Sequence, residues 1–497
     1  MLPLLSSLIG ALVTLSLAPF DLWPLGILSC LLLCLILDRC EPRQALWCGW
    51  FYGLGFFGTG VSWVYVSIHV YGQASMPLAI FLTAAFCAGL AFFHALFAWC
   101  YVRWLRDLPG GLLFGFPALW VLLEWLRGWI LTGFPWLYLG YAHLDTPLAG
   151  WGPVVGVFGL SLACALSATC LLLGWRHLHQ AIFFGCLSIL LIMWGGGALL
   201  RSTDWVRPSG QAALNVALYQ PNIPLEHKWD SNYLPQILRQ YREAMSSLYG
   251  RDLVIWPESA VPRYYQDIQE WISPVALRAG RDRTALITGI PYRESGSETI
   301  YNSIVAVGNG EGVYHKQRLV PFGEYVPLEG LLRGLIAFFD LPMSSFSPGP
   351  HNQGLLRAGK MNVAPLICYE IAYPELVARS ARESDMLVTI SNDIWFGKSI
   401  GPLQHLQIAR MRALENGRYV LRATNNGVSA IIDHLGRIVA RSRQFVRTTV
   451  EGRVQVLLGR TPFSRHGVAP VIVACALVLV VLVVLGRKSL SQAGGSS

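Results

Sequence analysis

The charged residues of this chain are segregated, and this limits the possible folds more than any other feature. Residues 201–466 contain 30 of the 38 Lys and Arg and 23 of the 29 Asp and Glu. The other 231 residues carry only 8 basic and 6 acidic side chains. Because a charged side chain is costly inside a bilayer, long uncharged apolar segments predict membrane helices. We therefore expect a membrane protein with one large water-exposed domain.

Apolar segments of roughly 20 residues are long enough to cross the hydrocarbon core. Eight are expected, near 4–20, 22–38, 45–68, 76–102, 111–134, 149–174, 179–200 and 467–486. They predict a transmembrane domain over 1–200 with about seven helices, a C-terminal transmembrane helix over 467–486 and a short cytoplasmic tail over 487–497.

The basic residues of the short connections predict the orientation. They fall in alternate connections, at Arg39, Arg43, Arg103, Arg106, Arg176, Arg487 and Lys488. Cytoplasmic loops are enriched in Lys and Arg, so both termini are expected in the cytoplasm. Residues 201–466 are then expected outside, which in a bacterium with two membranes is the periplasm.

Segments within 201–466 alternate between strand and helix patterns. "ALNVALYQ" (213–220), "DLVIWPES" (252–259) and "VAPLICYE" (363–370) are typical of buried strands, whereas "LPQILRQYREAMSSL" (234–248) is typical of an amphipathic helix. This alternation predicts an α/β domain.

The formal net charge of +9 excludes few classes of binding partner. Scattered arginines are typical of a solvated face, and contact with anionic lipid head groups is the alternative. Nucleic-acid binding is not expected, because no basic stripe is interleaved with aromatic residues. No Cys/His ligand spacing is present, so neither a metal nor a cofactor is expected.

Cys368 is the only one of the 11 cysteines that lies away from the long apolar segments. A domain in an oxidising compartment usually pairs its cysteines. An unpaired thiol there is either buried and inert or used as a nucleophile, and the residue alone does not decide between the two.

Acidic and basic residues that could activate a thiol follow predicted strands elsewhere in the domain. Glu258 comes directly after the apolar run of "DLVIWPES", at the strand end where α/β sheets place their chemistry. Lys316 and Glu324 lie in "YHKQRLVPFGEYVPL" (314–328). A buried Glu can act as a base, and a lysine can stabilise a thiolate or an oxyanion. An N-cap role for Glu258 and a surface position for Lys316 are the alternatives.

The order Glu, Lys, Cys in these segments resembles the nitrilase superfamily, and the whole chain resembles the apolipoprotein N-acyltransferase family within it. The resemblance rests on "GVSWVYVSIHVYG" (60–72), "EWLRGWILTGFPWLYLGY" (124–141), "YQPNIPLEHKWD" (219–230), "WPES" (256–259), "YHKQRLVPFGEYVPL", "ICYE" (367–370), "SNDIWFG" (391–397) and "ARMRALENGRYVLRATNNGVSA" (409–430). It implies a nitrilase-like αββα sandwich as the fold of residues 201–466.

The resemblance also implies roles for individual residues. Glu258 matches the general base of the family, Lys316 the lysine that stabilises the tetrahedral intermediate, and Cys368 the nucleophile. The supporting positions are Glu324, which orients the lysine, Tyr369 and Glu370 beside the nucleophile, Trp229 on a mobile arm, and Asn302 near the site. For Trp229, an ordinary core position is the alternative.

The activity implied by the resemblance is transfer of an acyl chain by a ping-pong mechanism. The expected donor is a phospholipid, most simply the sn-1 chain of phosphatidylethanolamine, and the expected acceptor is the N-terminal amine of a diacylglyceryl-cysteine apolipoprotein. A monomer is expected. The alternatives are a membrane-tethered amidase and a transporter with an accessory domain. Glu124 and Arg127, within an apolar segment, fit either a structural ion pair or a functional site.

Overall fold

The computed structural model describes residues 2–325 and 345–494, and the chain divides into two compact units. The helical unit comprises Met1–Tyr65, Ser75–Thr203 and His466–Ser497, and the α/β unit comprises Val66–Ala74 and Asp204–Arg465. The last residues of the expected tail, 495–497, and the end of the motif over 314–328 lie outside the described residues.

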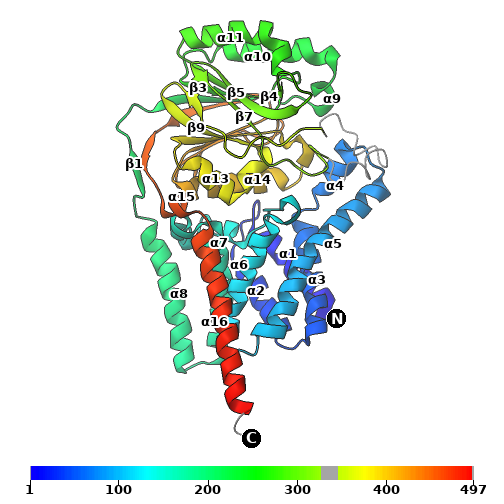
Figure 1. The fold of residues 1–497 in the computed structure, drawn as a ribbon, viewed down its shortest axis with the longest axis vertical. Helices are drawn as coiled ribbons and strands as arrows, with labels where there is room; N and C mark the ends of the chain where they lie inside the picture. Colours follow the sequence, from blue (N-terminus) through cyan, green and yellow to red (C-terminus); the bar gives the residue numbers. More distant parts are fainter. Residues whose placement is uncertain (1, 326–344, 495–497) are drawn as a thin grey trace. The chain divides into compact units, whose positions relative to one another are not determined.

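The helical unit is built from apolar helices (Figure 1). These are α1 (Leu2–Ser16), α2 (Pro24–Leu37), α3 (Pro42–Gly60), α5 (Met76–Cys100), α6 (Phe116–Arg127), α7 (Gly152–Arg176), α8 (Ala181–Leu200) and α16 (Ala469–Gly494). Proline occupies the first turn of α2, α3, α5, α6 and α7, where its missing N–H costs no helical hydrogen bond.

Four described helices are long and apolar enough to cross a membrane, and five if the bent pair Pro42–Gly60 and Val64–Tyr71 counts as one span. They are Met76–Leu105, Pro147–Arg176, Ala181–Leu200 and Ala469–Gly486. The expected count of eight is therefore not confirmed. At 1.5 Å per residue, α1 and α2 reach roughly 20 Å, which is less than the roughly 30 Å of a hydrocarbon core.

The expected span over 111–134 is not one helix. Only Phe116–Arg127 is α-helical, and Leu131 has a φ of 52° inside the short turn that follows. Glycines at 128 and 133 and Pro135 explain the interruption, because neither residue type favours helix continuation. In contrast, α16 continues to Gly494, beyond the expected end at residue 486.

The α/β unit contains two large sheets. The six-stranded sheet has the order β14 (Thr448–Val454), β2 (Leu214–Gln220), β3 (Leu253–Ile255), β4 (Ala285–Arg293), β5 (Ile300–Gly308), β7 (Val313–His315). The seven-stranded sheet has the order β13 (Ile438–Arg441), β12 (Ala430–Ile432), β11 (Val420–Thr424), β10 (Met386–Ser391), β9 (Met361–Ile367), β8 (Leu356–Ala358), β6 (Gly310–Glu311). In each sheet the central strands are parallel, namely β2, β3 and β4 in one and β9, β10 and β11 in the other.

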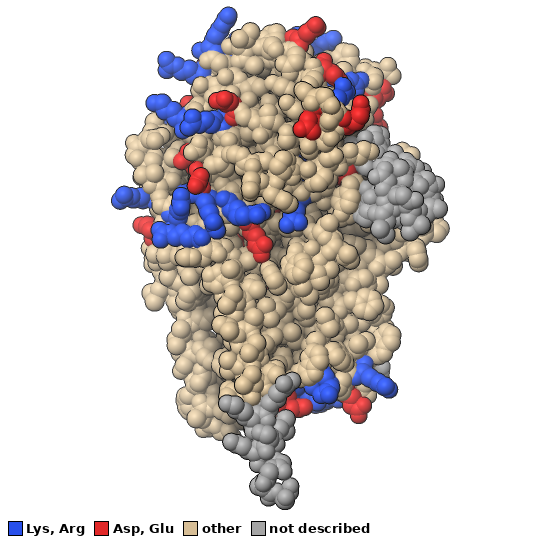
Figure 2. Space-filling model, in the orientation of Figure 1, with Lys and Arg blue, Asp and Glu red and all other residues tan. Residues whose placement is uncertain are grey.

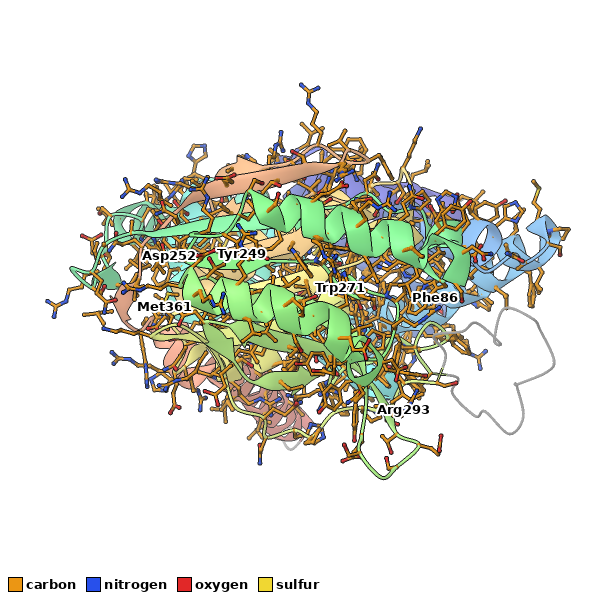
Figure 3. The ribbon with its side chains drawn as sticks, turned by 90° about the horizontal axis from the view of Figure 1, so that it is seen from above. Phe86, Tyr249, Asp252, Trp271, Arg293 and Met361 are labelled. Atoms are coloured by element: carbon orange, nitrogen blue, oxygen red, sulfur yellow. The ribbon has the colours of Figure 1, made fainter. Side chains whose placement is uncertain are left out.

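One apolar core lies between the two sheets, and side chains such as Leu218 of β2, Ile255 of β3 and Val388 of β10 share it. Helices α10 (Leu234–Ser246) and α11 (Gln269–Arg281) cover the outer face of the six-stranded sheet through a second core. Seen from above, α10 and α11 lie side by side, with Trp271 on α11 (Figure 3). Helices α13 (Pro374–Ala381) and α14 (Gly401–Asn416) contact β9 and β11 of the other sheet. The order of layers is therefore αββα.

The charged side chains on the face drawn in Figure 2 lie mainly on the α/β unit. The sides of the helical unit are almost uncharged on that face, and its few charges gather at one tip. This distribution fits helices whose sides contact lipid.

Candidate active site

The ends of parallel strands bring the predicted catalytic residues together. Glu258 lies three residues after β3, and Cys368 directly follows β9. Lys316 directly follows β7. The carboxyl ends of parallel strands are where open α/β sheets bind ligands, so the local folding of "DLVIWPES" and "VAPLICYE" positions both groups.

The Glu258 carboxylate is held by two hydrogen bonds and is almost fully buried. Its Oε1 accepts from Asn302 Nδ2 at 2.8 Å, and its Oε2 accepts from the backbone N–H of Asn392 at 2.8 Å. Asn302 also donates to Glu324 Oε1 at 2.8 Å, so one amide joins the two carboxylates. The structure thus places Asn302, as predicted, beside the site.

The Lys316 ammonium lies between the same two carboxylates. Its Nζ donates to Glu324 Oε2 at 2.6 Å and is 3.7 Å from Glu258 Oε1. Burial alone would lower the pKa of Lys316, but the Glu324 and Glu258 carboxylates outweigh it and hold that pKa above its usual value. Lys316 therefore stays protonated and carries a positive charge at neutral pH.

The Cys368 thiol is kept in its neutral form at rest. Burial raises its pKa, the Glu258 and Asp393 carboxylates raise it further, and Lys316 lowers it. The backbone of Cys368 has a φ of 52°, a left-handed conformation that residues with a side chain rarely adopt. Such strain is often found at functional sites.

The two neighbours of the nucleophile differ in their contacts. Glu370 is fully buried and accepts at Oε1 from the N–H groups of Gln317 and Arg318 and from the Tyr314 hydroxyl. Its Oε2 accepts from the Ile367 N–H at 2.8 Å. Burial raises the pKa of Glu370 to about 7. Tyr369 is half-buried, and its ring packs edge-on against Tyr373.

Trp229 packs in a small apolar cluster rather than in the sheet cores. The cluster centres on Leu319 and Phe346, and the other partly buried members are Ile300, Tyr325 and Trp395. Leu319 is three residues from Lys316, so Trp229 lies near the loop that carries Lys316.

Several polar residues at the site were not predicted individually. Lys228, beside Trp229, is buried and donates to the backbone carbonyl of Glu258 at 3.0 Å, and burial lowers its pKa to about 8. Ser391, Asp393, His405 and Arg422 form a buried network that reaches Cys368. The motif "SNDIWFG" contains Ser391 and Asp393 and was a signal for them, whereas nothing in the sequence tied His405 to Cys368.

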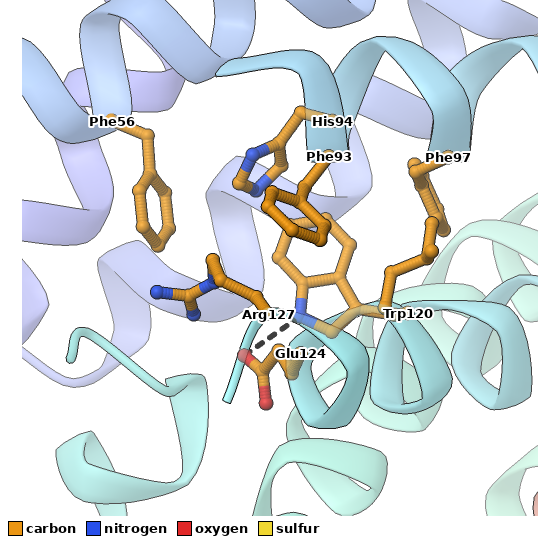
Figure 4. A pocket seen from close by; sticks show the side chains of 8 residues that line it. Phe56, Phe93, His94, Phe97, Trp120, Glu124 and Arg127 are labelled. Atoms are coloured by element: carbon orange, nitrogen blue, oxygen red, sulfur yellow. Dashed lines mark hydrogen bonds between the residues drawn. The ribbon is translucent and has the colours of Figure 1, made fainter. Parts of the chain in front are cut away.

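Glu124 and Arg127 belong to the helical unit. Figure 4 shows both beside a cavity of about 20 Å³ that is lined by Phe56, Phe93, His94, Phe97, Trp120 and Leu123. Glu124 Oε1 accepts from Trp120 Nε1 and from the Leu139 N–H, both at 3.0 Å. Arg127 donates to the carbonyl groups of Phe134 and Trp136. Both side chains therefore bind the segment 134–139, which favours a structural role.

A partly buried thiol beside a carboxylate and a protonated lysine is suited to nucleophilic attack on a carbonyl carbon. The carboxylate can take the thiol proton, and the ammonium can stabilise the oxyanion. Among residues 2–325 and 345–494, no group of three or more His, Cys, Asp or Glu could hold a metal ion.

Two sequence families match the two parts of the chain. Residues 9–170 match the apolipoprotein N-acyltransferase N-terminal domain, and residues 215–462 match the carbon-nitrogen hydrolase family.

Curated relatives align with nearly the full length of the chain. The apolipoprotein N-acyltransferase of Azotobacter vinelandii is 50% identical over 99% of this chain and 96% of its own length. That of Pseudomonas paraeruginosa is 50% identical over 98% and 96% of the two chains, and that of Vibrio parahaemolyticus is 40% identical over 98% and 97%.

Solved structures that are similar to this chain cover about half of it. A nitrilase-superfamily protein of Saccharomyces cerevisiae has a TM-score of 0.38 and 20% identity, covering 49% of this chain and 91% of that one. An amidase from Nesterenkonia sp. has a TM-score of 0.39 and 19% identity, covering 54% and 97%.

Proposed function

Because the chain belongs to the apolipoprotein N-acyltransferase family, we propose that Cys368 carries an acyl chain as a thioester between a phospholipid and an apolipoprotein. The protein is an acyltransferase of lipoprotein maturation and a bacterial inner-membrane protein. The near-full-length relatives favour this activity over that of a membrane-tethered amidase. The observation that carries the catalytic proposal is the buried grouping of Glu258, Lys316 and Glu324, joined through Asn302.

In the first half-reaction, Glu258 takes the thiol proton from Cys368. The sulfur attacks the ester carbonyl carbon of the donor, which we propose is the sn-1 ester of phosphatidylethanolamine. The Lys316 ammonium and backbone N–H groups stabilise the oxyanion. When the ester C–O bond breaks, Glu258 returns the proton to the leaving alkoxide. A lysophospholipid leaves, and the acyl group stays on Cys368.

In the second half-reaction, the α-amine of the diacylglyceryl-cysteine attacks the thioester carbonyl carbon. Glu258 takes a proton from the amine, and the C–S bond breaks. The thiolate is reprotonated by Glu258, and the product is an amide. The apolipoprotein thereby gains its third acyl chain.

Protection of the thioester from water distinguishes a transferase from a hydrolase. The apolar cluster of Trp229, Leu319, Phe346, Tyr325 and Trp395 supports this requirement, because apolar side chains near the reactive carbonyl exclude water. We propose that Trp229 contacts the acyl chain of the bound donor.

Both substrates are lipids, and we propose a matching arrangement in the membrane. Residues 1–200 and 467–486 form the membrane domain with eight crossings, which include the short helices α1, α2 and α6, around which the bilayer is locally thinned. Residues 201–466 lie in the periplasm, both termini lie in the cytoplasm, and the enzyme acts as a monomer. The alternation of basic connections supports this orientation.

The thioester is tested by the intact mass of the purified full-length protein after incubation with phosphatidylethanolamine. Wild type is expected to gain the mass of one acyl chain, which hydroxylamine removes. The Cys368→Ser variant is expected to gain no hydroxylamine-sensitive mass. Addition of a diacylated lipopeptide should discharge the wild-type adduct and acylate the peptide.

An adduct of equal stoichiometry in Cys368→Ser would overturn Cys368 as the nucleophile. No wild-type adduct with any phospholipid, together with release of ammonia from small amides, would favour the amidase instead.

A further inference from the structure

A group of buried polar side chains that the proposed reaction does not use contacts Cys368. It consists of Ser391 at the end of β10, Asp393 two residues later, His405 on α14 and Arg422 on β11. None of the four is more than 1% exposed. Buried polar and charged groups are costly unless they are hydrogen-bonded, so the partners of these side chains indicate what they do.

His405 contacts the backbone of the nucleophile. Its Nε2 is 3.1 Å from the carbonyl oxygen of Cys368, and its Nδ1 is 3.2 Å from Nη2 of Arg422 and 3.3 Å from Oδ1 of Asp393. A carbonyl oxygen only accepts, so the proton of the neutral ring must be on Nε2. Burial and the Arg422 guanidinium lower the pKa of His405 and outweigh the Asp393 carboxylate, which raises it, so the ring stays neutral and Nδ1 accepts from Arg422.

Asp393 is linked to the sulfur of Cys368 by the hydroxyl group of Ser391, which lies between them. Burial alone would raise the pKa of Asp393, but the Arg422 guanidinium and the hydrogen bond from Ser391 outweigh it and hold that pKa well below its usual range. The ionised carboxylate only accepts, from Arg422 Nη2 at 2.6 Å and from Ser391 Oγ at 2.5 Å. Because the single hydroxyl proton of Ser391 points to Asp393, its oxygen faces Cys368 Sγ, 3.4 Å away, as an acceptor for the thiol.

We propose that His405, Asp393 and Arg422 form a positioning unit for the nucleophile, which holds Cys368 at its carbonyl oxygen and, through Ser391, at its sulfur. This inference rests on the proposed function of Cys368. It extends that function, because it assigns a positioning role to three residues that do not touch the substrate.

The positioning unit matters because the backbone of Cys368 is strained at a φ of 52°. The hydrogen bond from His405 fixes the peptide plane between Cys368 and Tyr369. Since a peptide is planar, the N–H of Tyr369 is fixed as well and points away from His405. This N–H, which belongs to the peptide that follows the nucleophile, is thereby assigned as a donor to the oxyanion that forms on attack.

Two conservative variants of His405 separate the two ring nitrogens. His405→Gln places an amide N–H near the position of Nε2 and keeps the bond to the Cys368 carbonyl. His405→Asn places its amide near the position of Nδ1 and loses that bond. The rate of thioester formation is measured for the full-length protein at saturating phosphatidylethanolamine, by intact mass at timed intervals.

The rate of thioester formation is expected to be highest in wild type, lower in His405→Gln and lowest in His405→Asn. The Gln variant should remain within about 3-fold of wild type, and the Asn variant should be slower by about 10- to 100-fold, the range for a misplaced reacting group. The donor concentration for half-maximal rate should not change, because no residue of the unit touches the donor. Leu406→Ala is the control, since Leu406 is a buried neighbour on α14 outside the unit.

Equal rates in the Gln and Asn variants would overturn the proposal, as would an equal loss in Leu406→Ala. Nitrogen NMR of the wild-type His405 ring, assigned by its absence in His405→Gln, gives a test that does not depend on the activity of any variant. A proton on Nε2 supports the proposal, and a proton on Nδ1 of a neutral ring overturns it. If Cys368 were not the nucleophile, wild type would form no thioester at all, and this result is distinct from a failure of the positioning unit.

Discussion

At the scale of single residues, Glu370 shows how one buried carboxylate can fix two parts of a site. It accepts from the N–H of Ile367, the residue before Cys368, and from the N–H of Gln317, the residue after Lys316. Each carboxylate oxygen accepts from at least one backbone N–H. Glu370 therefore links the two strand ends that carry Cys368 and Lys316.

Glu370→Gln is expected to reduce activity although it preserves size. In either orientation, the new amide group places an N–H against a backbone N–H and leaves a buried donor unsatisfied, at a cost of about 1–3 kcal/mol. Acyl transfer to a diacylated lipopeptide should fall by about 10-fold or more. The control is Glu383→Gln, because Glu383 is exposed. Equal activity of Glu370→Gln and wild type would refute the linking role.

The same variant changes the pH dependence of stability. The pKa of Glu370 is raised to about 7 from 4.5, so between these values the folded protein binds more protons than the unfolded chain. This contribution to stability is complete below about 4.5 and is lost as pH rises to about 7. Wild type should therefore lose more thermal stability than Glu370→Gln between pH 5 and pH 7.

At the scale of elements, the helical unit depends on close approach of α1 and α3. A Cβ on Gly55 of α3 would clash with the backbone carbonyl of Ser7 on α1, and a Cβ on Gly10 would clash with that of Tyr52. Small residues at such positions allow backbones to pack closely in membrane helices.

Gly55→Ala should therefore lower the thermal unfolding temperature of the protein in detergent. Gly58→Ala on the same helix is the matched control, because a Cβ there meets no atom within 4 Å. Both substitutions have the same intrinsic effect on helix formation, a gain of about 0.5–1 kcal/mol. A lower unfolding temperature in both variants, or in neither, would show that the α1–α3 contact does not limit stability.

The elements also show what sequence could predict. The strands that precede Glu258 and Cys368 were visible as apolar runs followed by polar residues, and the αββα layers followed from the resemblance. The buried network was not visible, because His405 and Arg422 lie on a different helix and strand and meet Cys368 only through parallel pairing of β9, β10 and β11. The α-helix of the expected span over 111–134 ends at Arg127, and hydropathy could not predict this because it does not register the φ of 52° at Leu131.

At the scale of the whole chain, the basic connections of the helical unit meet at one end. Arg106 donates to the backbone carbonyls of Leu37 and Cys40, and Arg176 pairs with Asp38. Three connections that are distant in the sequence therefore lie together. This geometry agrees with the alternation of basic residues along the chain, and it supports placing that end on the cytoplasmic side.

Reporter fusions test this orientation directly. The turn at residues 294–298 is exposed in the α/β unit, and we expect alkaline phosphatase inserted there to be active, because this enzyme requires the oxidising exterior. A fluorescent protein that folds only in the cytoplasm should fluoresce when fused after residue 497 and should be dark when inserted at 294–298. The reverse pattern would place the catalytic unit inside the cell, where Cys368 would need no protection from oxidation. Fluorescence at neither position would place both positions outside the cytoplasm, which requires an even number of crossings between them, so α16 would then not cross the membrane.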